Sequence, residues 1–197
     1  MLKANLHRLT GAALAAGSLL FIVNKFNDMS RIYFNIPLRD VVPGDNVLLV
    51  ALGQILLVAG CLGCYLVYAK RSSRAGKIGL GLFAGGVILV ALGHIDFTPY
   101  SPNEALFVLV LVGVLLMLAG LVLFGVLNVR SRALAYWQAL PLITGLLGVA
   151  GFILSGGSEN NPVVFLALRT CFGIGLVLMG IVLWQDKVVK AQVAQPN

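Results

Sequence analysis

Six long apolar segments limit what this chain can fold into. They cover approximately residues 8–26, 47–69, 77–95, 104–127, 134–155 and 162–184. Each is close to the roughly 20 residues that an α-helix needs to cross the hydrocarbon core of a bilayer. Only 11% of the 197 residues are charged, whereas a soluble domain carries about 25%. We therefore predict an all-α integral membrane protein with six transmembrane helices in a single domain, residues 1–197.

The even-numbered segments contain a recurring motif: LLVAG ends at Gly60, LMLAG at Gly120 and LVLMG at Gly180. A second set of glycines, Gly53, Gly113 and Gly173, lies seven residues before the first. Such fixed-period similarity is typical of repeat architectures. The odd-numbered segments align more loosely around Gly17, Gly86 and Gly148. We predict three tandem two-helix hairpins in the same orientation, covering roughly residues 8–69, 77–127 and 134–184.

The same glycines suggest how the helices pack. Residues seven apart on an α-helix are only about 20° out of register, so they share one face. Lipid provides no hydrophobic driving force between helices, and small residues let two backbones approach closely instead. We therefore expect Gly53, Gly60, Gly113, Gly120, Gly173 and Gly180 to lie at helix–helix contacts.

The charged residues are distributed unequally between the two sides of the predicted bundle. The N-terminus, the second and fourth connections and the C-terminus carry ten basic residues and one acidic residue, Asp186. The basic residues are Lys3, Arg8, Lys70, Arg71, Arg74, Lys77, Arg130, Arg132, Lys187 and Lys190. The opposite side carries three basic and six acidic residues. Lysine and arginine excess marks cytoplasmic loops, so both termini should be cytoplasmic. This placement accounts for the net charge of +7 without a nucleic-acid partner.

The longest connection, residues 27–46, contains a short apolar stretch from Ile32 to Leu38. Tyr33 and Phe34 lie near Arg31 and Arg39, a combination that suits the membrane–water interface. We expect this loop to lie on the outer membrane face, or alternatively to cover the outer mouth of the bundle.

Arg169 is the most informative single side chain, because it lies seven residues into the last apolar segment. An ionisable residue inside a span costs at least about 2.5 kcal/mol on insertion scales and marks a functional site by default. Its expected partners are Glu159 first, then Asp96 or Asp28, with His94 nearby. These five residues are the candidate polar or anion site. The alternative, which we favour, is a structural ion pair or a side chain extending to the interface.

The cysteines and Gln54 could also take part in chemistry, but each has a simpler structural interpretation. Cys61 and Cys64 form a C-x-x-C motif, but a metal site of this kind needs a second ligand pair. Cys171 falls in the other half of the membrane, so we interpret the cysteines as packing residues. Gln54 should bond a neighbouring helix or, alternatively, line a polar path. We predict no metal and no cofactor, and we leave open whether the chain is an enzyme, with a non-enzymatic role favoured.

Three functional classes remain open. The favoured one is a structural or accessory subunit that packs against other membrane proteins through glycine-lined helix faces. The alternatives are a small transporter or channel with a site near Arg169, and a lipid-binding or lipid-modifying membrane protein. The expected partners are membrane lipids and other membrane subunits, and the expected location is a bacterial inner (plasma) membrane.

Overall fold

The computed structural model describes residues 2–24, 47–93, 104–131, 134, 137–155 and 162–185. These residues form six α-helices: α1 (Leu2–Asn24), α3 (Val47–Tyr68), α4 (Arg74–Gly93), α5 (Glu104–Ser131), α6 (Leu140–Ser155) and α7 (Pro162–Gln185). Five of the helices are long and apolar enough to cross a membrane. The predicted all-helical, multi-pass membrane architecture is therefore confirmed. The predicted interfacial loop, residues 27–46, lies outside the described residues.

Helix α6 is shorter than the apolar segment that predicted it. It has 16 residues, which at about 1.5 Å per residue gives roughly 24 Å, less than a hydrocarbon core of about 30 Å. The segment from residue 134 was expected to be helical, but the helix begins only at Leu140. Trp137 has a φ of 53°, and its carbonyl accepts a hydrogen bond of 2.8 Å from the amide of Leu140. This left-handed residue turns the chain before α6, and Pro141 sits in the first turn, where its missing N–H costs nothing.

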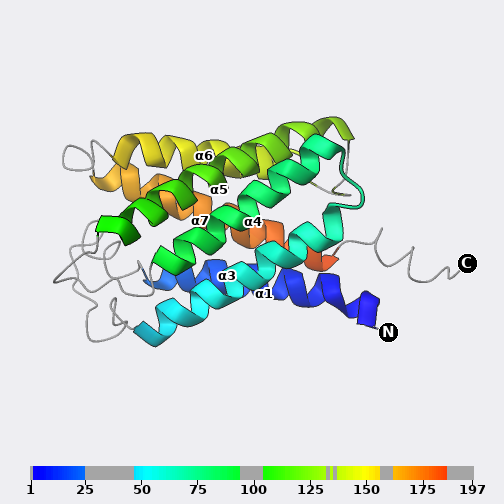
Figure 1. Ribbon diagram of the computed structural model, residues 1–197, viewed down its shortest axis with the longest axis horizontal. Helices are drawn as coiled ribbons and strands as arrows, with labels where there is room; N and C mark the ends of the chain where they lie inside the picture. Colours follow the sequence, from blue (N-terminus) through cyan, green and yellow to red (C-terminus); the bar gives the residue numbers. More distant parts are fainter. Residues whose placement is uncertain are drawn as a thin grey trace, which may run out of the picture.

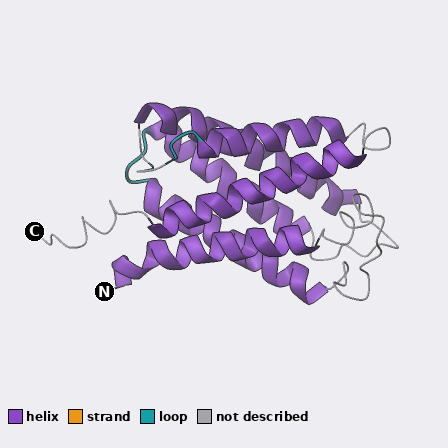
Figure 2. Cartoon of the chain, turned by 180° about the vertical axis from the view of Figure 1, so that it is seen from behind, coloured by secondary structure: helices purple, strands orange, loops and turns teal. Residues whose placement is uncertain are grey.

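The six helices form a closed ring. Each helix packs against the next one in the chain, and α7 packs against α1. The first turn of α1, the α3–α4 turn, the end of α5 and the end of α7 all lie at one end of the bundle, on the right in Figure 1. The view from behind shows the same arrangement, in which the described residues are almost entirely helical (Figure 2). We call this end, which carries most of the described basic residues, the basic end.

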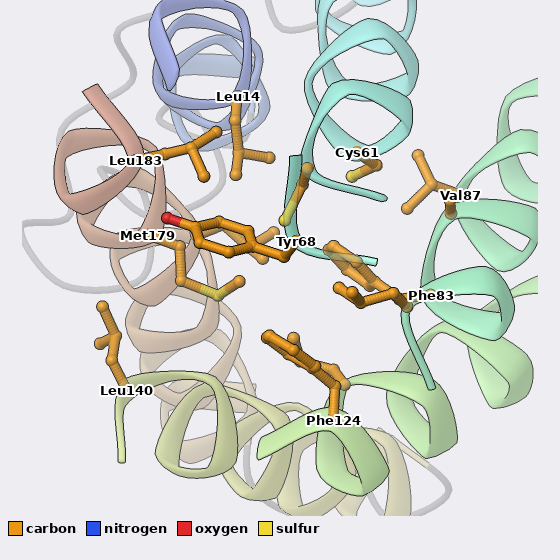
Figure 3. Close-up of a cluster of buried hydrophobic side chains, with 14 of the residues drawn as sticks. Leu14, Cys61, Tyr68, Phe83, Val87, Phe124, Leu140, Met179 and Leu183 are labelled. Carbon is orange, nitrogen blue, oxygen red and sulfur yellow. The ribbon is translucent and has the colours of Figure 1, made fainter. Parts of the chain in front are cut away.

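Large apolar side chains are buried inside the ring. Tyr68, Phe83 and Phe124 are almost completely buried. Figure 3 shows Tyr68 between Phe83 on one side and Met179 and Leu183 of α7 on the other. In lipid, this interior contributes stability through van der Waals packing rather than through removal of apolar surface from water. This core packs α3, α4, α5 and α7 against one another.

Candidate functional site

Glycines bring α4 and α5 into backbone contact at two levels. A Cβ added to Gly86 would lie 2.7 Å from the Cα of Met117 and 2.5 Å from the carbonyl oxygen of Gly113. About two helical turns closer to the basic end, a Cβ on Gly120 would lie 2.5 Å from the carbonyl oxygen of Gly79. Real Cβ atoms almost never approach backbone atoms this closely. The two helices can therefore lie at this distance only because these positions have no side chain.

Corresponding positions meet between α1 and α3. A Cβ on Gly17 would lie 3.0 Å from the carbonyl oxygen of Gly53, and a Cβ on Gly60 would lie 2.6 Å from the Cα of Leu14. The Gly17–Gly53 contact thus corresponds in sequence to the Gly86–Gly113 contact of the next hairpin.

Two of the three glycines of α7, Gly173 and Gly180, face a different neighbour. A Cβ on Gly180 would lie 2.7 Å from the carbonyl oxygen of Gly11, and one on Gly173 would lie 2.8 Å from Cγ1 of Ile22. Both contacts are with α1 rather than with α6, the hairpin partner of α7. Between α6 and α7, by contrast, the ring of Phe172 fills the space beside Gly148. Gly173 and Gly180 therefore close the ring of helices.

Arg169 lies on the same side of α7 and also faces α1. Its guanidinium carbon is 5.2 Å from the centroid of the Phe21 ring, within the range of a cation–π interaction. The Arg169 side chain is half-buried. The other four members of the candidate anion site, Glu159, Asp96, His94 and Asp28, lie outside the described residues.

Phe21 was not anticipated from the sequence. It is one of many apolar residues in α1, and nothing in the periodicity of α1 distinguishes it. The antiparallel packing of α1 against α7 decides which aromatic ring meets the guanidinium.

The buried polar side chains within the described ranges are distributed among helix contacts rather than along one path. Ser18 donates a hydrogen bond of 2.7 Å to the carbonyl of Leu14 in its own helix. Thr10 and Thr144 pack against Gly63 and Gly175 of neighbouring helices. Such residues satisfy local backbone groups or fill the space beside a glycine. Gln54 is half-buried in α3.

The cysteines are free thiols in two settings. Cys61 and Cys64 are buried in the core, and Cys171 is exposed on α7. Across the ranges the structure describes, no group of three His, Cys, Asp or Glu residues could hold a metal ion.

The fold and the described side chains define a class: this chain is a multi-pass integral membrane protein with a closed ring of helices and an apolar core. No protein family, no curated protein and no solved structure matches it.

The contact between Arg169 and Phe21 predicts measurable energetic coupling. In a double-mutant cycle with Arg169→Met and Phe21→Leu, we expect a coupling free energy of about 0.5–1 kcal/mol in unfolding from detergent. The cycle isolates this pair, because Arg169→Met removes the other interactions of Arg169 equally in the protein with Phe21 and in the Phe21→Leu variant. Strictly additive effects of the two substitutions would show that the ring does not stabilise the guanidinium.

Proposed function

We propose that this chain is a structural subunit of a larger membrane protein assembly. The observation that supports the proposal is the apolar core inside the ring, where Tyr68, Phe83 and Phe124 are buried between helices. A protein with such an interior acts through its surface. Most of that surface is apolar, with exposed side chains on every described helix, so the partners would be other membrane-embedded proteins.

We also propose the finer architecture expected from the sequence: three like-oriented hairpins with both termini in the cytoplasm. The corresponding glycine contacts of the first two hairpins support the repeat. The position of the α3–α4 turn and the end of α5 at the same end of the bundle supports the orientation (Figure 1). Lysine and arginine at that end would retain it on the cytoplasmic side.

The proposed function predicts a larger particle in the native membrane. Extraction in a mild detergent, followed by native mass spectrometry, should yield this chain together with other membrane subunits. After delipidation in a harsher detergent, the separated chain should retain its helical circular dichroism spectrum, because its core is internally packed. A solitary monomer under the mild conditions, with no subunit recovered by crosslinking in the intact membrane, would contradict the proposal.

A second candidate function is that of a small transporter or channel. The position of Arg169 within a span supports it, because intramembrane cations often lie on ion or substrate pathways. This function would require a substrate-dependent flux in proteoliposomes that Arg169→Met abolishes. If Arg169→Met alters stability alone, Arg169 has a structural role.

A further inference from the structure

We infer that the α3–α4 turn and the adjoining face of α4 form a binding site for an anionic phospholipid. The site combines a cluster of cations at the membrane surface with a strip of missing side-chain volume directly below it. The cations would hold the headgroup, and an acyl chain would lie along the strip. This inference is independent of the proposed subunit function.

The first observation is the concentration of exposed positive charge at the turn and the start of α4. Lys70, Arg74 and Lys77 are all exposed. Among the residues that the structure describes, the sole acidic residue is Glu104, at the start of α5 and the opposite end of the bundle. Clusters of basic residues beside a span attract anionic headgroups by about 1 kcal/mol per charge.

The second observation is that hydrogen bonds hold the turn in one conformation. The hydroxyl of Ser72 donates to the carbonyl of the buried Tyr68 at 2.9 Å, and the amide of Arg71 donates to the same carbonyl at 3.0 Å. Ser73 caps α4, because its hydroxyl oxygen accepts a hydrogen bond of 3.2 Å from the amide of Gly76. The cations are therefore presented from a fixed backbone, which lowers the entropic cost of binding a headgroup.

The third observation is the lack of side chains below the cations. Arg74, Lys77, Gly81 and Gly85 fall within an arc of about 80° on α4, at 100° per residue. A Cβ added to Gly85 would meet nothing within 4 Å, and one added to Gly81 would meet only the Tyr65 ring, at 3.8 Å. Gly85 lies eight residues beyond Lys77, about 12 Å deeper along the helix. One face of α4 thus carries the cations near the surface and the open strip further into the membrane.

The charge of the site favours a lipid over a helix of another protein as its occupant. A transmembrane helix seated on Gly81 and Gly85 would use the glycines but leave the cations without a counter-charge. A phospholipid with a negative headgroup would use both parts of the site. Zwitterionic lipid has the same acyl chains without the net charge, so comparison of the two lipids tests the headgroup contribution.

The test is lipid titration of the purified full-length chain in detergent, with bound lipid counted by native mass spectrometry. We expect phosphatidylglycerol to bind more tightly than phosphatidylcholine of the same chain composition. The double variant Arg74→Gln/Lys77→Gln should weaken phosphatidylglycerol binding about 30-fold. The matched control, Arg8→Gln/Arg130→Gln, removes the same charge from exposed residues of α1 and α5 and should change the affinity little. Gly85→Leu should weaken binding by filling the strip, with an unchanged melting temperature.

Three results would overturn the inference. Equal losses in the two double variants would show unspecific attraction to the whole basic end. Displacement of the lipid by soluble glycerol 3-phosphate at equal concentration would show an anion site that does not use the acyl chain. Loss of a protein subunit from native-membrane extracts of Gly85→Leu, with lipid binding intact, would assign the strip to a partner helix. Because the titration uses the isolated chain, its outcome does not depend on whether an assembly is recovered.

Discussion

Gly86→Ala should destabilise the folded protein by about 1–3 kcal/mol, whereas Gly85→Ala should leave it unchanged or stabilise it by up to about 1 kcal/mol. The two glycines are adjacent in α4, and alanine has the better helix propensity at both positions. At Gly86, however, the added methyl group would lie 2.5 Å from the carbonyl oxygen of Gly113 in α5. Backbone atoms cannot move aside as a flexible side chain can, so α4 and α5 must separate.

The variants Gly85→Ala and Gly86→Ala can be compared by thermal unfolding in the same detergent, with tryptophan fluorescence and size-exclusion chromatography as the readouts. Leucine at the same two positions should give a larger difference in stability between the two variants. Gly86→Leu should give little folded protein, and Gly85→Leu should have the melting temperature of the unmodified chain. Similar melting temperatures for Gly85→Ala and Gly86→Ala would contradict the close approach of α4 and α5.

Asn128→Leu is expected to destabilise the protein by about 2–4 kcal/mol, because one buried side chain bonds two backbone groups of the α5–α6 connection. The Asn128 amide nitrogen donates to the carbonyl of Gln138 at 2.7 Å, and its oxygen accepts from the amide of Leu134 at 2.9 Å. Asn128 is 1% exposed, and its bond to the amide of Leu134 is buried, so leucine leaves that amide without its side-chain partner. Leucine has the same branched arrangement of side-chain heavy atoms, so the substitution removes the hydrogen bonds and keeps the shape of the side chain.

Hydrogen exchange gives this prediction a local readout. In Asn128→Leu, the Leu134 amide should exchange faster, together with the first turn of α6, while α1 and α3 remain protected. Val129→Leu, at the next position and 43% exposed, is the control and should change neither stability nor exchange. Unchanged protection of Leu134 in Asn128→Leu would show that the connection is held by packing alone.

The sequence by itself determined the six helices and their class. Lipid as solvent requires long apolar segments with internally bonded backbones, so the helix positions follow from hydropathy. The start of α6 was the exception. The apolar segment begins at Leu134, but Leu134 and residues 137–139 belong to the connection before α6, where Trp137 is left-handed and Asn128 bonds Leu134 and Gln138. Hydropathy does not distinguish an apolar connection from an apolar helix.

The tertiary structure alone decided which neighbour each helix face meets. Periodicity places Gly173, Gly180 and Arg169 on one side of α7, but it does not reveal that this side faces α1 and the Phe21 ring. Nor does it separate Gly86, in contact with α5, from Gly85, beside open space. In a soluble protein the exposed face would be polar and the buried face apolar. In a membrane both the lipid and the neighbouring helix are apolar, so hydrophobicity carries no information about which face is buried, and only packing determines it.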